Sequence, residues 1–248
     1  MQRSVAAIAT TPVKGFALSF PDSVALGAGG VEENRRFALL DGNSERLRSS
    51  KHAWPCTVTA DYDAETEHLS MRLPDGRTLA GAVATADPVA FDYHGSLVDA
   101  HVVSGPWADA LSSLAGMPVR LVRLDRPGKV QGEPVTLVSS ASLRKLEAEA
   151  GHEVDAKRFR MLFHVDGCLA HEEDEWLGRP VRIGEAVVHV VELVERCVVT
   201  TRDPSSGQRD LDTLALLKRY RGSIDFGVRA SVVEPGVVGV GAVVEPLD

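Results

Sequence analysis

Cys197 is the residue of this sequence best suited to metal or redox chemistry. It lies in the segment 195–203, ERCVVTTRD, which a Pro-Ser-Ser-Gly turn follows. A β-like run that ends in hydroxyls and a turn would display the thiolate at a rim, where nearby arginines lower its pKa and let it bind a soft metal. A lone cysteine is more often a small buried hydrophobe. Spacing alone therefore leaves a metal ligand and a core residue as alternatives.

Two arginines separated by one residue, Arg158 and Arg160, form a second candidate site. Because alternate residues of a strand share a face, we expect their guanidinium groups to converge on one anion if this segment is a strand. Two separate surface ion pairs are the alternative. A predicted turn from a strand into a helix adds hydroxyls and free amide groups, at Ser139, Ser140 and Ser142.

Several common catalytic motifs are absent from the sequence. The glycine-rich segment 27–30 is followed by Val31, without the GK(S/T) ending of a P-loop or the spacing of a dinucleotide fingerprint. No GxSxG elbow marks a serine hydrolase, and the histidines show no HExxH spacing. The acidic run 172–175 suits cation binding or acid–base chemistry, but a helix start stabilised by the helix dipole is the simpler explanation.

The composition is that of a globular, acidic protein. The 248 residues are 44% hydrophobic and 25% charged, and 35 acidic against 27 basic side chains give a formal charge of −8. This charge argues against nucleic-acid binding through a general positive field, although it allows a local basic pocket. No apolar run reaches the roughly 20 residues of a membrane span, and no signal peptide is visible. We therefore expect a cytoplasmic protein.

The residue content and the turns predict a mainly β fold with α+β elements. Three scattered cysteines are too few for a disulfide framework, and aromatic residues make up only 5% of a chain that is rich in Val, Ala and Gly. We expect strands at 4–10, 37–40 and 119–124, and a hairpin around the Pro-Asp-Gly turn at 74–76. Helices are predicted at 107–116, from 140 to about 150, and from Asp210 or Asp212 to Tyr220. The chain is expected to end in a hairpin that turns at 234–236, and 125–133 reads as a linker.

Taken together, these motifs resemble the MOSC family, the molybdenum-cofactor sulfurase C-terminal domain, preceded by its N-terminal β-barrel partner. In the N-terminal part, TPVKG at 11–15 is similar to the family's PVK motif, and NRRF at 34–37 to its Asp-Arg-aromatic strand start. The C-terminal part carries, in order, SSASL at 139–143, RFR at 158–160, DG at 166–167, EDEW at 173–176, IG at 183–184, RC at 196–197, TTRDP at 200–204 and FG at 226–227. The resemblance covers nearly the whole chain.

The resemblance implies a smaller N-terminal β-rich domain at 1–95 and a MOSC β-barrel domain at 96–248, which the first strand of the chain could join. It also implies a molybdenum cofactor of the molybdopterin type, not pyridoxal phosphate, with Cys197 as the metal ligand. The cofactor-binding residues it implies are Lys14, Arg35, Ser139, Ser140, Ser142, Arg158, Arg160, Thr200 and Thr201.

Within the family, the sequence resembles the bacterial relatives of the mitochondrial amidoxime-reducing component. That branch implies an oxidoreductase that reduces small N-hydroxylated or N-oxygenated compounds, with Cys197 and Asp203 as catalytic residues. Asp203 is a candidate proton donor, and an Asp-Pro turn residue is the alternative role. Because the sequence has no flavin or haem motif, we expect electrons from a separate electron-transfer protein.

Two other functions stay open at this point. Cys197 could instead carry sulfur as a persulfide, or the pocket could carry the cofactor without turnover. The MOSC scaffold could also serve another binding or catalytic role, since fold does not fix function.

The chain departs from the family pattern in three places. Gly15 stands where a serine is frequent in the family, and Leu162 stands where an asparagine is frequent. Ser49-Ser50-Lys51 lies near the place where relatives carry an arginine-glutamine pair.

Overall fold

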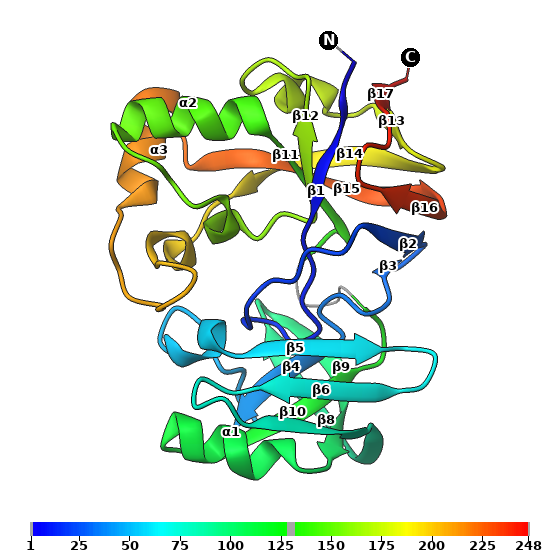
Figure 1. Cartoon of the computed structure of the whole chain (residues 1–248), viewed down its shortest axis with the longest axis vertical. Coiled ribbons are helices and arrows are strands. Elements are labelled where there is room, and N and C mark those ends of the chain that lie inside the picture. The colour runs from blue at the N-terminus through cyan, green and yellow to red at the C-terminus, as the bar shows by residue number, and fades with distance from the viewer. Residues whose placement is uncertain (1, 128–131, 248) are drawn as a thin grey trace.

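Seven strands form a sheet that nearly closes into a barrel in the computed structural model, which describes residues 2–127 and 132–247 (Figure 1). The order is β1-β12-β11-β15-β14-β13-β17. The two outer edges meet, because the Val5 N–H donates to Ala242 O at 2.9 Å and the Val244 N–H to Arg3 O at 3.0 Å. The strands are β1 Ser4–Ile8, β11 Val135–Ser139, β12 Phe163–Asp166, β13 Pro180–Ile183, β14 Ala186–Glu195, β15 Asp225–Glu234 and β17 Val244–Pro246.

This sheet is covered on both faces. Every residue of β11 is buried. Leu137 packs in the barrel interior with Phe163 and Val228, whereas Val138 packs on the other face with Leu146 and Leu217. Apolar residues on both faces of one strand therefore reflect a core inside the barrel and a second core under two helices.

Helices α2 (Ser140–Ala150) and α3 (Thr213–Arg221) form that cover, and they lie side by side over the sheet in Figure 1. Ser139 caps α2 by accepting the Ser142 N–H, and Asp212 caps α3 by accepting the Ala215 N–H. Each helix ends at a glycine in the left-handed conformation, Gly151 or Gly222. Both predicted helices are confirmed. They could be predicted because the residues that start and end a helix act locally.

The N-terminal half packs two smaller sheets against helix α1 (Trp107–Ala115). Phe37, Leu69 and Trp107 share one buried cluster there, and Leu69 lies in the predicted hairpin. The four-stranded sheet contains β4 Phe37–Asp41, β8 Ala84–Tyr93, β9 Ser96–Ser104 and β10 Val119–Leu124, and the three-stranded sheet contains β5 Thr59–Asp63, β6 His68–Arg72 and β7 Thr78–Ala82.

The strand pairing favours a different division of the chain from the predicted one. The boundary between residues 95 and 96 falls in the turn of the β8–β9 hairpin, and β10 pairs with β9 and β4 in the same sheet. The sheets change between Leu124 and Val135. We therefore propose the division within the linker 125–133, of which residues 128–131 lie outside the described part. β1 joins the C-terminal sheet by pairing with β12.

The predicted C-terminal hairpin is wrong. β16 (Gly236–Gly239) pairs with β2 (Ser23–Gly27) in a sheet whose third strand is β3 (Gly30–Val31), and it does not pair back on β15. The physical reason is that β15 already has β11 and β14 on its two edges. Pro235 also has no N–H to continue a ladder. Within the described residues, no helix is both long and apolar enough to span a membrane.

Candidate functional site

Cys197 lies where β14 gives way to a short 3-10 helix, η4 (Val198–Thr201), and it is a free, exposed thiol. Its carbonyl oxygen accepts the Thr200 N–H at 3.0 Å and the Thr200 hydroxyl at 3.0 Å. These two bonds fix the backbone of Cys197 while its side chain remains accessible. The prediction of a thiol displayed at a strand end is thus consistent with the geometry.

Arg196, the preceding residue, anchors this strand end in the interior. Its buried guanidinium donates through Nε to Phe226 O at 2.9 Å and through Nη1 to Phe159 O at 3.0 Å. It also lies over both phenyl rings, with Cζ 5.2 Å and 6.0 Å from the centroids of Phe159 and Phe226. Because Phe159 directly precedes Arg160, Arg196 ties the position of Cys197 to that of Arg160.

The loop that carries Lys14 lies against the segment that carries Arg35. The Lys14 N–H donates to Phe37 O at 2.9 Å, and the Arg35 N–H donates to Thr11 O at 2.7 Å. Val13 and Phe37 are both fully buried and form a parallel bridge. The two N-terminal motifs found in the sequence are therefore one structural unit.

Arg35 and Arg160 are joined directly. The Arg35 Nη2 donates to Arg160 O at 2.8 Å, and the Arg160 Nη2 donates to Phe16 O at 2.6 Å. Both residues adopt positive φ, +54° and +52°, which costs a non-glycine residue free energy. Such strain is typical of functional sites, where the surrounding contacts hold a residue in a required orientation.

The cations of this cluster repel one another. Burial lowers the pKa of Lys14 well below its usual value, and Arg35, Arg46 and Arg160 lower it further, whereas Cys197 raises it. Burial and the charge of Arg160 also lower the pKa of Arg35 to about 9. A bound anion would relieve this repulsion and stabilise the charged forms. We call Lys14, Arg35, Arg160 and Cys197 the cation–thiol cluster.

Tyr93 and Arg46 also reach this cluster, and the sequence analysis missed both. The Lys14 Nζ donates to the Tyr93 hydroxyl at 2.8 Å, and Arg46 Cζ lies 4.2 Å from the centroid of the Tyr93 ring. Both residues come from the N-terminal half, far in sequence from Cys197. The local signal that could have pointed to Tyr93 is the His94-Gly95 turn that follows it.

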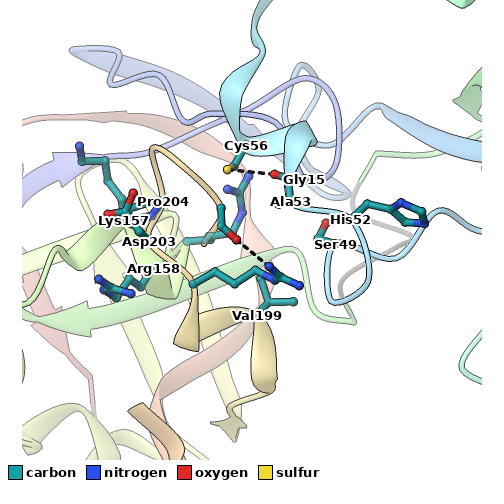
Figure 2. Close-up of a pocket in the computed structure, with 13 residues that line it drawn as sticks. Gly15, Ser49, His52, Ala53, Cys56, Lys157, Arg158, Val199, Asp203 and Pro204 are labelled. Carbon is teal, nitrogen blue, oxygen red and sulfur yellow. Dashed lines mark hydrogen bonds between the residues drawn. The ribbon is translucent and has the colours of Figure 1, made fainter. Parts of the chain in front are cut away.

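A small cavity of about 40 Å³ adjoins the cluster through Gly15 and Arg160. Figure 2 shows Ser49, His52, Ala53 and Cys56 on one side of this cavity. Asp203 and Pro204 lie opposite them, in the segment 197–207, which we call the cysteine loop. The Cys56 thiol donates to Ala53 O at 3.2 Å, and burial raises its pKa. This space has room for only a few water molecules and is too small to enclose a pterin.

The structure corrects the prediction for Ser139 and Ser142. Both are fully buried, and the Ser139 N–H and the Ser142 hydroxyl donate to Glu173 Oε1 at 3.1 Å and 2.7 Å. The N-terminus of α2 therefore binds a carboxylate of the chain itself, which comes from η3 (Glu172–Trp176). Ser140 is half-buried in the first turn of α2 and is not part of the cation–thiol cluster.

The predicted strand through Arg158 and Arg160 is wrong. Residues 156–159 form a 3-10 helix, η2 (Ala156–Phe159), and Arg160 caps it in the left-handed conformation. The two guanidinium groups consequently separate. Arg158 makes a bidentate ion pair with Asp210, with Nη1 2.7 Å from Oδ1, while Arg160 joins the cluster.

Three residues of the cysteine loop stabilise its conformation. The Thr200 hydroxyl bonds that of Thr213 at 2.6 Å, and the Thr201 hydroxyl donates to Val198 O at 2.7 Å. Asp203 Oδ1 accepts the backbone N–H groups and the hydroxyls of Ser205 and Ser206, which hold the pKa of Asp203 well below its usual range. An aspartate that stays ionised suits a turn role and not that of a proton donor.

The departures from the family pattern have structural explanations. Gly15 has a φ of +99°, and a Cβ there would lie 2.8 Å from the Ser49 Oγ. Ser49 thus places a hydroxyl next to the position that a serine side chain at residue 15 would take. Leu162 is fully buried in the barrel core, and its N–H donates to Thr136 Oγ1. Its side chain lies in the barrel interior and does not face the cluster.

A family comparison decides the identity of the fold around this site. The model of the MOSC domain matches residues 112–245, more than half of the chain. The chain belongs to the MOSC domain family. Its MOSC region includes Cys197 and Arg160, whereas Lys14 and Arg35 come from the part before residue 112.

Several curated proteins are similar to this MOSC protein. Human mitochondrial amidoxime-reducing component 1 is 26% identical over 233 residues, which cover 84% of this chain and 68% of that protein. Molybdenum cofactor sulfurase 2 of Aedes aegypti is 25% identical over 228 residues, 88% of this chain and 29% of that protein. The amidoxime-reducing component 1 of Xenopus laevis is 31% identical over 120 residues, 44% of this chain and 34% of that protein. The matched region thus makes up about a third of the length of the Xenopus and Aedes proteins and about two thirds of the human protein. The YUAD protein of Bacillus subtilis covers 99% of this chain and 96% of its own, at a TM-score of 0.49 and 10% identity, too low to support a functional comparison.

Proposed function

We propose that this MOSC protein is a molybdenum-cofactor-dependent oxidoreductase that reduces N-hydroxylated or N-oxygenated compounds. Membership of the MOSC family and similarity to amidoxime-reducing components and a molybdenum cofactor sulfurase support a function related to the molybdenum cofactor. The single observation that carries the finer proposal is the exposed Cys197 thiol, whose charge acts on Lys14, the residue on which Arg35 and Arg160 also act.

The residues present fit a phosphate-bearing cofactor that has a thiolate ligand. Buried cations that repel one another gain most when an anion binds between them. Cys197 is the candidate metal ligand, because it is a free, exposed cysteine and a thiolate is a ligand for soft metals. The molybdenum centre, when bound, would supply the two-electron reduction of the N–O bond.

The chain's own residues would bind and orient the partners of this reaction. Lys14, Arg35 and Arg160 would hold the cofactor phosphate, and Arg196 fixes the backbone on which Cys197 is displayed. Ser49 and Gly15 line the adjoining cavity. A separate electron-transfer protein supplies the electrons. We propose a cytoplasmic location for the reaction.

Catalysis by the purified protein tests this proposal. An amidoxime or an N-hydroxylated dye is incubated with reduced viologen as an artificial electron donor, and formation of the amidine or amine is measured. We expect turnover by the wild type and by Cys56→Ala, and none by Cys197→Ala. Equal turnover by the wild type and Cys197→Ala would overturn the role of this thiol.

A carrier of sulfur or of the cofactor is the second candidate function. The exposure of Cys197 favours it, because a persulfide carrier must offer its thiol to another protein. Cysteine-bound sulfur that reductant releases, together with no turnover in the viologen assay, would favour the carrier over the reductase.

A further inference from the structure

Tyr93 is held next to the cation–thiol cluster by the turn of its own hairpin. The two residues that follow it, His94 and Gly95, have φ values of +55° and +83°, and Tyr93 pairs with Ser96 across them. Positive φ at both central residues is the mark of a type I′ turn, the tightest common connection between two strands. The turn therefore fixes the backbone position of Tyr93, from which its side chain extends to the cluster.

The Tyr93 side chain contacts two cations. Its hydroxyl accepts a hydrogen bond from the Lys14 Nζ at 2.8 Å, and that nitrogen lies 4.9 Å from the ring centroid. The guanidinium of Arg46 lies 4.2 Å from the same centroid. The face of an aromatic ring attracts cations, so the ring stabilises two like charges close together. Burial raises the pKa of Tyr93, so its hydroxyl stays neutral.

Tyr93 is one of the contacts that keep Lys14 in the cluster, where the neighbouring cations repel it. Its ammonium is surrounded by Arg35, Arg46 and Arg160, and its flexible side chain has other rotamers that would carry the charge toward water. The Tyr93 hydroxyl and ring oppose this outward movement. Neither the family motifs nor the predicted site included a residue with this task.

We propose that Tyr93 is a positioning residue, which holds the Lys14 ammonium in the cluster so that it can bind the phosphate of a ligand beside Cys197. This inference rests on the proposed function, because that function places the phosphate there. It assigns the β8–β9 hairpin of the N-terminal half a part in the site. Tyr93 acts through Lys14 and has no chemical step of its own.

A double-mutant cycle tests this inference without a loaded enzyme. Binding of inorganic phosphate to the full-length protein is measured by isothermal titration calorimetry at one pH for the wild type, Tyr93→Phe, Lys14→Gln and the double variant. Loss of a hydrogen bond to a charged group predicts about tenfold to 150-fold weaker binding by Tyr93→Phe. In the Lys14→Gln background, the same change is expected to alter the affinity by less than about twofold.

Tyr62→Phe is the matched control, because Tyr62 is a buried tyrosine of the same half that packs edge-on against Phe37. Its phosphate affinity should equal that of the wild type. The positioning role would be overturned if Tyr93→Phe weakened phosphate binding equally with Lys14 and with Gln at that position. It would also be overturned if Lys14→Gln weakened phosphate binding and Tyr93→Phe did not. Both outcomes leave the phosphate pocket itself in place. Absence of phosphate binding by the wild type, or unchanged binding by Lys14→Gln, would overturn both the pocket and the role of Tyr93.

Discussion

Replacing Arg196 with methionine should destabilise the whole protein and loosen the site. The change removes the donors to Phe226 O and Phe159 O and leaves two buried carbonyl groups without these partners. Each unsatisfied buried acceptor costs about 1–3 kcal/mol. The methionine also removes a buried charge, whose desolvation lowers the pKa of Arg196 to about 9, and this offsets part of the loss. We expect a net decrease of about 3 kcal/mol in the free energy of unfolding, a large fraction of a typical domain's stability.

Urea unfolding followed by circular dichroism measures this effect. The midpoint should fall while the slope of the free energy against urea concentration stays the same. Arg182→Met is the matched control, since Arg182 lies exposed on β13 and its loss should change the free energy by less than about 0.5 kcal/mol. A variant Arg196→Met that is as stable as this control would refute the anchoring role. Unchanged alkylation kinetics of Cys197 in the same variant would refute its link to the site.

Three further changes have defined outcomes. Burial raises the pKa of Glu173, so the ionised carboxylate is less stable in the folded protein than in the unfolded chain. Glu173→Gln removes this charge and should therefore raise the melting temperature at pH values above the pKa of Glu173 in the folded protein. The increase should vanish below about pH 4, where the carboxyl is protonated in both states. A gain that is the same at every pH would contradict this reasoning. Gly15→Ser should lower the melting temperature, because φ is +99° and a Cβ would meet the Ser49 Oγ at 2.8 Å, and Ser49→Ala should restore part of the loss. No rescue would mean that backbone strain alone sets the cost. Arg160→Ala should weaken cofactor retention by roughly 1–3 kcal/mol in dialysis measurements, whereas Arg158→Ala should not; equal retention by both variants would count against the cluster.

Local features of the sequence predicted much of this fold. Ser139 and Asp212 mark helix starts, Gly151 marks a helix end, and the Pro-Asp-Gly turn marks a hairpin, because each signal acts within a few residues. The pairing of β16 with β2 was not predictable in this way. It depends on β15 having both edges occupied, which is a property of the assembled sheet.

The candidate site was predicted in part for the same reason. Motif residues such as Lys14 and Arg35 meet because Val13 pairs with Phe37, and the resemblance brought both motifs to attention. The sequence could not show that Glu173 fills the N-terminus of α2, since this contact joins residues more than thirty positions apart. Tyr93 was missed because its hydrogen bond with Lys14 joins residues 79 positions apart and leaves no local pattern.

Metal and pterin analysis of the purified protein tests the central claim most directly. The wild type, Cys197→Ala and Cys56→Ala are purified without oxygen after expression with molybdate, and molybdenum and pterin are measured per chain. The cation–thiol cluster predicts molybdenum and pterin together in the wild type and in Cys56→Ala, with molybdenum lost from Cys197→Ala. Molybdenum content that is equal in all three proteins, or absent from the wild type, would contradict it.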